Sequence, residues 1–241
     1  MNILDSIKTS LLTPIHPAGI PFIAIFFILT IIIGWFWTPL YYIGFTLTLW
    51  CVYFFRNPSR TTPMLSGSNK NNLIISPADG KVIEISQITP SEDIGLPEGN
   101  WTRVCVFMNV FDVHVNRSPM SGQISYKKYI PGSFFNASLD KASEKNERLI
   151  LNMDTENGNK IAFVQIAGLV ARRIICEVEI GHSLKAGEIF GLIRFGSRVD
   201  IYFPSEVSVM VLKGQKMIAG ETIIGDFSKS AKSVKEIIDE K

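Results

Sequence analysis

The sequence predicts a mainly β protein, α+β overall. An antiparallel β-sandwich-like domain follows an N-terminal apolar helical hairpin and precedes a short C-terminal helix. Three observations lead to this prediction. Charged residues are absent from Pro17 to Phe55, hydrophobicity alternates with a period of two from Leu73 onwards, and turn-forming residues separate the alternating segments. With 241 residues, the chain can bury the core of one domain that carries an appendage.

The N-terminal part, 1–56, is predicted to be a membrane-associated helical segment. Residues 1–16 are amphipathic, and about 39 residues without charge follow, where about 20 would span a bilayer. Thr38-Pro39 interrupts this run, because proline breaks or kinks a helix, so we expect helices at 20–37 and 40–55. A hairpin buried in a soluble core and a shallow insertion that does not span remain the alternatives.

The flanks of the apolar run indicate where the protein resides. Tryptophans and tyrosines such as Trp35, Trp37 and Tyr53 are typical of a membrane interface. Arg56 and Arg60 follow the run and favour the cytoplasmic side, on which both chain ends would lie after two crossings. The run is too long for a cleavable signal peptide and lacks a basic region before it. We therefore expect a protein of the cell membrane that faces the cytoplasm.

The rest of the chain divides into a linker and a β domain. Residues 57–72 are rich in Pro, Ser, Gly, Asn and Thr and are interpreted as the linker, and 73–241 as the domain. We expect a partly helical segment at 135–148 and the terminal helix at 228–240. The predicted strands are 81–88, 103–110, 122–130, 160–171, 174–180, 189–195, 199–203 and 207–213.

Composition excludes several classes of function. A net charge of +2 without a basic run argues against nucleic acid as a partner. The three cysteines have neither the number of a disulfide framework nor the spacing of a metal site, so no metal is expected. Only His16, His114 and His182 can supply an imidazole. We interpret His16 as a residue at the membrane interface and His182 as a turn residue, and neither is among our candidate catalytic residues.

Four short segments have residues suited to chemistry. Taken singly, each has a structural explanation: a turn, a buried histidine, a solvated charge cluster and a β kink. The segments are Ser76-Pro77-Ala78-Asp79-Gly80, Phe111-Asp112-Val113-His114-Val115-Asn116-Arg117-Ser118-Pro119, Asn146-Glu147-Arg148, and Leu192-Ile193-Arg194-Phe195-Gly196-Ser197.

Ser197, His114 and Asp79 together could form a Ser-His-Asp set. The Gly-x-Ser-x-Gly elbow of hydrolases is missing, because Ser197 follows Gly196 directly and leads into a strand. A serine in that position suits attack on its own preceding carbonyl, which moves the Gly196 acyl group from nitrogen to oxygen. Elimination of the ester and hydrolysis would leave a pyruvoyl group at a new N-terminus, with a carboxylate-oriented histidine as the base.

In this order and behind an apolar N-terminus, the four segments resemble phosphatidylserine decarboxylase, in its short bacterial and archaeal form. The resemblance covers essentially the whole chain. It implies self-cleavage between Gly196 and Ser197 into a β chain, 1–196, and an α chain, 197–241, which remain associated. It also implies a pyruvoyl cofactor derived from Ser197, which forms a Schiff base with phosphatidylserine in the membrane and yields phosphatidylethanolamine. Asp79 matches the charge-relay aspartate of the family.

The chain departs from the long form of the family at two places. Arg117 stands where that form has a second histidine, and Phe195-Gly196-Ser197-Arg198 replaces its Leu-Gly-Ser-Thr motif. Our hypothesis is that His114 serves both self-cleavage and decarboxylation, oriented by Asp79 or assisted by it as a base. Guanidinium groups suit phosphate, so the candidate substrate-binding residues are Arg117, Arg148, Arg194 and Arg198. The sequence does not determine the oligomeric state, and a homo-oligomer is one possibility.

The main alternative is a membrane-anchored carrier domain of the lipoyl or biotinyl type. Ala78-Asp79-Gly80-Lys81-Val82 and Leu184-Lys185-Ala186-Gly187-Glu188 are similar to the paired turns of such domains, and Asp140-Lys141-Ala142 imitates a lipoylation site. Lys141, however, lies in a helix-like context rather than a tight hairpin. A metallopeptidase lacks its His-x-His ligands here, and a membrane scaffold would leave Gly196-Ser197 uncut. Intact mass separates these alternatives, because only self-processing yields two chains.

Overall fold

The computed structural model describes residues 13–65, 71–137, 145–169, 173–194 and 196–230. They belong to two compact units, one up to Ser59 and one from Arg60 onwards. The fold class is the predicted one, with a helical hairpin in the first unit and antiparallel sheets in the second. Four expectations fall wholly or partly outside the described residues: most of the amphipathic stretch 1–16, residues 138–144 of the partly helical segment, the lipoylation-like Lys141, and 231–240 of the terminal helix.

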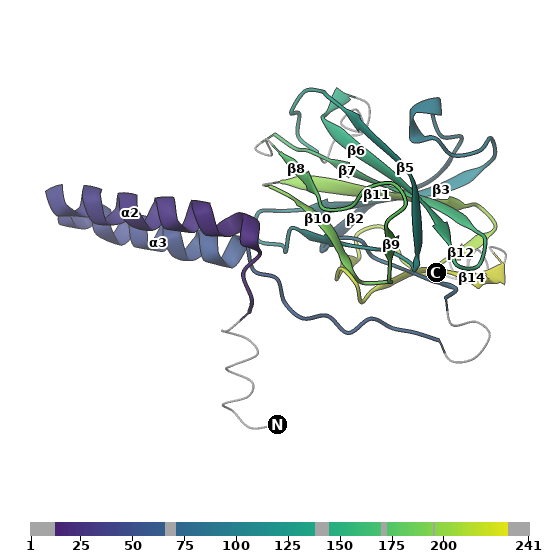
Figure 1. Ribbon diagram of the computed structural model, residues 1–241, viewed down its shortest axis with the longest axis horizontal. Coiled ribbons are helices and arrows are strands. Elements are labelled where there is room, and N and C mark those ends of the chain that lie inside the picture. The colour runs from purple at the N-terminus through teal and green to yellow at the C-terminus, as the bar shows by residue number, and fades with distance from the viewer. Residues whose placement is uncertain (1–12, 66–70, 138–144, 170–172, 195, 231–241) are drawn as a thin grey trace, which may run out of the picture. The chain divides into compact units, whose positions relative to one another are not determined.

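The helical hairpin is confirmed in the first unit. A 3-10 helix, η1 (Pro17–Gly19), leads into α2 (Ile20–Phe36), and α3 (Thr38–Phe54) returns beside it (Figure 1). Trp37 between the two helices is extended, with φ of −154°. Pro39 falls in the first turn of α3, where its missing N–H leaves no helical hydrogen bond unmade. The proline therefore marks a helix start after a sharp reversal.

Small residues bring the two helices close together. A β-carbon at Gly44 would lie 2.5 Å from the Thr30 hydroxyl, and one at Gly34 would lie 2.8 Å from the β-carbon of Tyr41. The hydroxyls of Thr30 and Thr48 are 3.3 Å apart across the interface. Close approach at glycine and threonine is typical of helices that pack in lipid, where no hydrophobic effect drives association.

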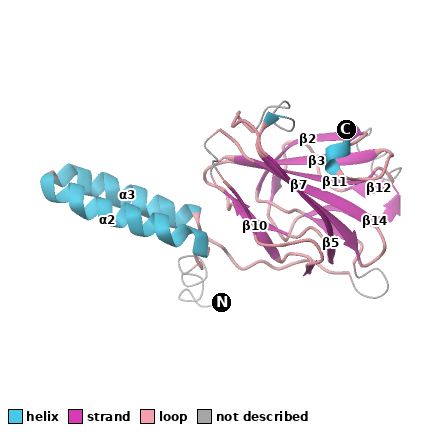
Figure 2. Ribbon diagram, turned by 45° about the horizontal axis from the view of Figure 1, so that its top comes forward, coloured by secondary structure: helices cyan, strands magenta, loops and turns pink. Residues whose placement is uncertain are grey.

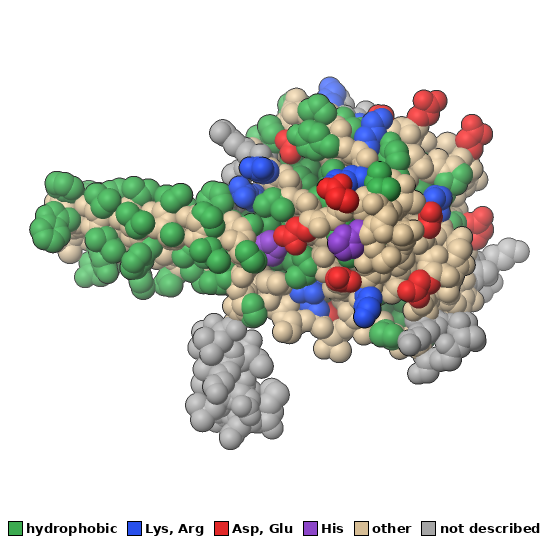
Figure 3. Space-filling view, viewed as in Figure 1, with side chains coloured by type: hydrophobic (Ala, Val, Ile, Leu, Met, Phe, Trp, Pro, Cys, Tyr) green, Lys and Arg blue, Asp and Glu red, His purple; other side chains and the backbone are tan. Residues whose placement is uncertain are grey.

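The outer faces of the hairpin are apolar. Its exposed side chains include Ile25, Phe27, Ile32, Phe45 and Leu49, and Figure 3 shows such side chains along the visible face of both helices. Of the described helices, Pro17–Phe36 is long and apolar enough to cross a membrane, with a mean hydropathy of 2.5. Exposure of so much apolar surface is unfavourable in water, and the segment could anchor the protein to a membrane.

In the part that the structure describes, the second unit is built mainly from strands and also contains a short 3-10 helix, η3 (Glu92–Ile94). The pairings between its described strands are antiparallel. The strands are β1 (Leu73–Ile75), β2 (Gly80–Ile88), β3 (Trp101–Met108), β4 (Val115–Arg117), β5 (Gly122–Ile130), β6 (Arg148–Thr155), β7 (Lys160–Ile166), β8 (Ile174–Cys176), β9 (Ser183–Leu184), β10 (Ile189–Ile193), β11 (Ser197–Pro204), β12 (Val207–Val209), β13 (Lys216–Met217) and β14 (Ile223–Ser230).

Within the described residues these strands form three sheets. The largest has eight strands in the order β13-β2-β3-β11-β7-β6-β5-β9. Figure 2 shows β11 between β3 and β7. The smaller two have the orders β4-β10-β8 and β1-β14-β12. β11 therefore lies in the middle of the large sheet, with eight residues paired to β3 and five paired to β7. It has no free edge.

Two hydrophobic clusters cover the two faces of the large sheet. The main core joins one face to the smaller sheets through side chains such as Val199, Ile201, Phe163 and Phe190. On the other face, Ile94 of η3 packs with Trp101, Ile150 and Tyr202. The segment between β2 and β3 thus covers the face that would otherwise meet water.

Each of the eight predicted strands overlaps a strand of the structure, and six further strands among the described residues were not predicted: β1, β4, β6, β9, β13 and β14. β6 was not predicted, although it pairs along its length with β5 and β7. Its first residue, Arg148, ends the segment that was expected to be partly helical. The strand expected at 174–180 ends at Cys176, and the start of the expected terminal helix, 228–230, belongs to β14. In β6 the apolar residues run on without clean alternation, because both of its faces are covered.

The beginning of the β unit lies within the expected linker. Arg60 makes an ion pair with Asp79 at 2.8 Å, and the Thr61 N–H donates to the Glu221 carboxylate at 3.0 Å. A β-carbon at Gly187 would lie 2.1 Å from the Thr62 hydroxyl. These contacts hold the start of the linker against the strands.

Candidate active site

Two chain crossings meet at one corner of the β unit. The chain leaves β3 in the large sheet and reaches β4 in a smaller one through residues 109–114. It returns from β10 in that smaller sheet to β11 through Arg194 and Gly196. Because β3 pairs with β11 and β4 pairs with β10, the two crossings lie side by side. The Ile193 N–H donates to the His114 carbonyl at 3.3 Å, which ties one crossing to the other.

Ser197 is the first residue of β11 and pairs with Met108. Its side chain lies on the core face of the sheet, two residues before Val199, and it is fully buried. Among the described residues, its hydroxyl oxygen has no hydrogen-bond partner. Gly196 before it has φ of +55°, in the left-handed region that glycine adopts without strain. A buried hydroxyl without a partner is uncommon and indicates a functional role.

His114 is fully buried in the adjacent crossing. Its Nδ1 lies 3.0 Å from the Asp112 carbonyl oxygen, which can only accept a hydrogen bond. Nδ1 therefore carries the hydrogen, and the lone pair of the neutral ring lies on Nε2. This backbone contact fixes both the tautomer and the ring orientation, which is the task that a general base requires of its support.

Asp79 lies at the same end of the large sheet, in the turn before β2. A β-carbon at Gly80 would lie 2.1 Å from the Phe107 carbonyl and 3.2 Å from the Met108 nitrogen, so the turn packs on the end of β3. The Asp79 carboxylate accepts from Arg60 at 2.8 and 3.0 Å and from the Ala219 N–H at 2.8 Å. Burial raises the pKa of Asp79, and the charge of Arg60 counteracts part of this rise. Asp79 and Ser197 therefore flank Met108, whereas orientation of His114 by Asp79 stays a prediction.

Two of the predicted arginines lie at or near this corner. Arg194 leads out of β10, and its pKa is lowered by burial and by the neighbouring charge of Arg173. Arg117, at the end of β4, donates to the Gly187 carbonyl at 2.9 Å. Burial and the charge of Arg60 lower the pKa of Arg117. The carboxylates of Asp79 and Glu221 already act on Arg117 and oppose the lowering of its pKa. Arg194 has the charge of Arg173 as its neighbour, and repulsion between two cations is relieved by an anion, so this place suits a phosphate or carboxylate group better.

The corner thus combines a serine after a left-handed glycine, a histidine with a fixed tautomer, and arginines beside them. The phosphatidylserine decarboxylase family model matches residues 47–225, which is well over half of the chain. The chain belongs to the phosphatidylserine decarboxylase family. The resemblance found in the sequence is confirmed, and membership makes the protein a decarboxylase that acts on phosphatidylserine. The matched range includes Asp79, His114 and Ser197.

The other two predicted arginines lie on the opposite face of the large sheet. Arg198 and Arg148 both pair with Ile166, so their side chains share a face that Ser197, one residue before Arg198, does not. Arg198 is fully buried and donates to the Asp200 carboxylate, and Arg148 contacts Asp93 at 3.6 Å. Strand alternation directs both side chains away from Ser197, so the geometry does not support substrate binding by either of them, and that role stays a prediction.

Arg60 contacts the predicted site residue Asp79 and was not itself among the predicted residues. It was treated as part of the linker, yet it holds the Asp79 carboxylate with two hydrogen bonds. The preceding residues, Asn57-Pro58-Ser59, indicate a turn and do not indicate a contact with Asp79. A charged residue in a segment of small polar residues was the one indication available.

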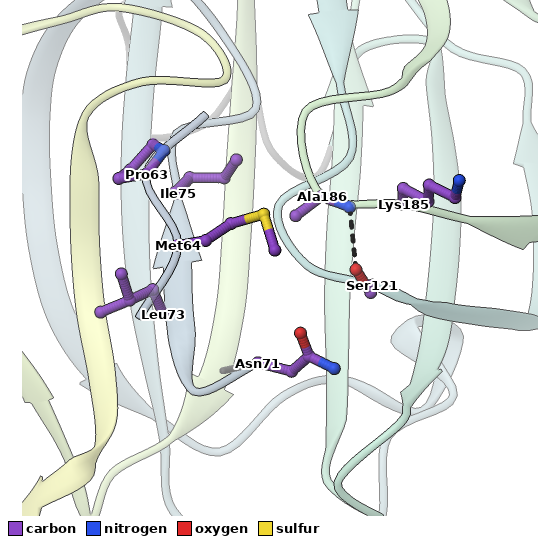
Figure 4. Close-up of a pocket in the computed structure, with 8 residues that line it drawn as sticks. All are labelled: Pro63, Met64, Asn71, Leu73, Ile75, Ser121, Lys185 and Ala186. Atoms are coloured by element: carbon purple, nitrogen blue, oxygen red, sulfur yellow. Dashed lines mark hydrogen bonds between the residues drawn. The ribbon is translucent and has the colours of Figure 1, made fainter. Parts of the chain in front are cut away.

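A cavity lies elsewhere in the decarboxylase domain (Figure 4). It has a volume of about 170 Å³ and is lined by Pro63, Met64, Asn71, Leu73, Ile75, Ser121, Lys185 and Ala186. Ser121 accepts a hydrogen bond from the Ala186 N–H on one side, and apolar side chains form the other. None of the predicted site residues lines it. His182 is exposed at the turn before β9, and within the described residues no group of His, Cys, Asp and Glu could hold a metal ion.

Proposed function

We propose that the protein converts phosphatidylserine to phosphatidylethanolamine with a pyruvoyl group that it makes by cutting itself between Gly196 and Ser197. The observation that carries this proposal is the buried Ser197 hydroxyl without a partner, directly after a glycine with φ of +55°. An ordinary turn does not require a buried polar atom, and in an ordinary strand a buried serine hydroxyl has a hydrogen-bond partner. A hydroxyl that attacks the preceding carbonyl requires both features.

The self-cleavage would proceed in three balanced steps. Ser197 Oγ attacks the Gly196 carbonyl carbon, the Gly196–Ser197 C–N bond breaks, and an ester links the two residues. A base removes the Cα proton of Ser197, and the ester oxygen leaves with Gly196 as its carboxylate, which produces dehydroalanine. Water then replaces the amino group, releasing ammonia and leaving pyruvoyl as the first group of the α chain.

His114 is the group that would move the proton in the first step. Its Nδ1–H is committed to the Asp112 carbonyl, so Nε2 is the basic nitrogen. Complete burial of His114 and Ser197 keeps out water that would hydrolyse the ester prematurely. Asp79, ionised with the support of Arg60, would stabilise the positive charge that His114 acquires.

The residues at the corner fit the pyruvoyl group, since Ser197 follows Gly196 directly and is enclosed by the core. When formed, the group would supply a carbonyl that condenses with the substrate amine and accepts the electrons released with CO₂. Arg194 and Arg117 would bind the phosphate or the carboxylate of the substrate. His114 would return a proton to the substrate carbon, so that one imidazole serves both reactions.

The pairing of β11 supports association of the two chains after the cut. The α chain, 197–241, would contribute β11, which lies between β3 and β7 of the β chain. It would also contribute β14, which pairs with β1. Separation would expose both edges of a buried central strand, so we expect the chains to copurify as one enzyme.

The helical hairpin would bring the enzyme to its lipid substrate. A diacyl lipid does not leave the bilayer freely, so its headgroup has to be processed at the membrane surface. The apolar exterior of α2 and α3 supports anchoring in the cell membrane, and Arg56 after α3 favours the cytoplasmic side. Protease added to sealed inside-out vesicles should digest the β unit, and protease added to right-side-out vesicles should not.

Intact mass of the full chain, purified in detergent, tests the proposal directly. We expect two polypeptides, 1–196 and 197–241, with the smaller one carrying pyruvoyl in place of serine and a blocked N-terminus. Ser197→Ala should give one uncut chain without decarboxylase activity on phosphatidylserine vesicles. His114→Ala and Asp79→Asn should slow the cut.

Two results would contradict the mechanism. An uncut wild-type chain that still releases phosphatidylethanolamine would exclude a pyruvoyl group made at Ser197. Complete processing in both His114→Ala and Asp79→Asn would exclude the roles given to these residues, while leaving the family's decarboxylation in place.

A further inference from the structure

Gly168 packs directly on the carbonyl group that self-cleavage would consume. A β-carbon at Gly168 would lie 1.8 Å from the carbonyl oxygen of Gly196 and 2.8 Å from its carbon. Gly168 is not among the glycines with positive φ, so its backbone conformation does not require glycine. Space does. Any side chain at position 168 would displace the Gly196 carbonyl.

The register of the large sheet explains this contact. Arg198 of β11 pairs with Ile166, the last residue of β7. Continuing the antiparallel register by two residues brings Gly168 alongside Gly196. The contact thus follows from the alignment of two central strands, and it lies just after the last residue of β7 and just before the first residue of β11.

Asn146 fixes the chain on the other side of Gly168. Its side-chain amide donates to the Ala167 carbonyl at 2.7 Å and to the Phe135 carbonyl at 2.8 Å, and its oxygen accepts from the Phe135 N–H at 2.9 Å. The Ala167 N–H donates to the Glu147 carbonyl at 2.9 Å. Asn146 is fully buried, so these hydrogen bonds are shielded from water. They hold the peptide that joins Ala167 to Gly168.

We propose that Gly168, held in place through Asn146, is a positioning residue for self-cleavage and forms a seat for the Gly196 carbonyl. A nucleophile must approach a carbonyl from above or below its plane, so the orientation of the carbonyl decides whether Ser197 Oγ can attack. The seat fixes that orientation before the reaction begins. This inference rests on the proposed self-cleavage. It also gives Asn146-Glu147 a role, since both residues bond to Ala167.

The size of the effect follows from the geometry. Non-bonded β-carbons do not approach other heavy atoms closer than 3.0 Å, so Gly168→Ala has to move the carbonyl oxygen, or Gly168 itself, by about 1.2 Å from the 1.8 Å contact. A misplacement of about 1 Å in a reacting group costs about 10²-fold in rate. We therefore expect Gly168→Ala to cut itself about 100-fold more slowly than the wild type.

The experiment follows the appearance of the smaller chain on denaturing gels after a pulse of synthesis of the full chain in membranes. Gly158→Ala is the matched control, because Gly158 has φ of +76° and a β-carbon there would meet nothing within 4 Å. It strains a turn of the same domain without touching the corner. Asn146→Ala leaves the glycine in place but removes two hydrogen bonds to carbonyls, and it should slow the cut less than Gly168→Ala.

Hydroxylamine separates positioning from a general loss of structure. It cleaves esters, so it would cut any chain in which the acyl group has moved to Ser197 Oγ. If the seat serves the attack, Gly168→Ala should remain uncut with or without hydroxylamine, while resisting protease as well as Gly158→Ala does. Asn146→Ala should show the same insensitivity if Gly168→Ala does not fold.

Three outcomes would overturn the inference: a wild-type rate in Gly168→Ala, accumulation of a hydroxylamine-sensitive ester in that variant, or an equal slowing in Gly158→Ala. Absence of self-cleavage in the wild type would instead contradict the proposed function. The two failures are therefore distinguishable.

Discussion

Removal of the Asp200 carboxylate should destabilise the β unit severely. Asp200 and Arg198 are both fully buried on the face of the large sheet that lies opposite Ser197. The Arg198 guanidinium donates through Nε and one terminal nitrogen to the two carboxylate oxygens, the latter at 2.8 Å. The same terminal nitrogen lies 2.8 Å from the sulfur of Cys105, and burial raises the pKa of that thiol. Asp200→Asn would leave a buried cation without its counter-charge.

The magnitude follows from the burial of both partners. Breaking a buried ion pair by removing one charge costs about 3–5 kcal/mol of unfolding free energy. A domain of this size changes its melting temperature by about 2–4 °C per kcal/mol, so the shift should be about 6–20 °C. Asp154→Asn is the control, since it removes the partially exposed pair with Lys160 and should cost less than about 1 kcal/mol.

The assay is protease resistance of the full chain in detergent as urea increases. A double variant, Arg198→Met with Asp200→Leu, replaces both charges by apolar groups and should recover most of the lost stability. A loss of less than about 1 kcal/mol of unfolding free energy in Asp200→Asn would refute the reasoning, because a buried guanidinium without its counter-charge should destabilise the fold by more than that. A double variant as unstable as Asp200→Asn would show that packing, and not charge, is what Asp200 supplies.

Three further predictions concern other groups. Arg60→Met should raise the pKa of Asp79 further, because the charge of Arg60 lowers that pKa. The acidic limb of the pH profile of the cleavage rate should therefore move to higher pH. An unchanged pH profile would contradict a need for ionised Asp79. The hydrogen bond from Lys128 lowers the pKa of Asp93, so this pair stabilises the fold above the ordinary carboxyl pKa of about 3.9 and is lost as the pH falls through the lowered value. Asp93→Asn should therefore make acid unfolding shallower, as followed by circular dichroism. Gln165→Leu removes the 2.8 Å hydrogen bond from the Gln165 amide to buried Asn116, and it should cost about 1–3 kcal/mol in urea unless Asn116→Val accompanies it.

The helical hairpin and most strands could be predicted because their signals are local. A run without charge and a proline at its centre define two helices whatever surrounds them. Alternation in β3 and turn residues before β5 likewise act over a few positions. β6 was missed because a strand covered on both faces loses its alternation, and only its neighbours β5 and β7 show that it is one.

The site was predicted unevenly for a related reason. Ser197 and His114 were singled out because Ser197 follows a glycine inside a β pattern and because the chain has only three histidines, and the two crossings bring their segments together. Substrate binding by Arg148 and Arg198 stays a prediction that the geometry does not support, because alternation along a strand tells which residues share a face and does not tell which face holds the site. Arg198, Asp200 and Tyr202 lie on the other face of the large sheet, where the segment around Ile94 covers the sheet, and all three are buried.

By itself, the sequence determined the composition of this protein's parts: an apolar hairpin, an antiparallel β domain, and four short motifs that indicated its family. Tertiary structure alone decided which backbones touch. That Gly168 lies against the Gly196 carbonyl, and that Arg60 holds Asp79, depends on strand register and on chain segments far apart in sequence. The physical reason is that periodicity and turn chemistry act over a few residues, whereas an active site is assembled by pairing strands whose alignment only the whole sheet fixes.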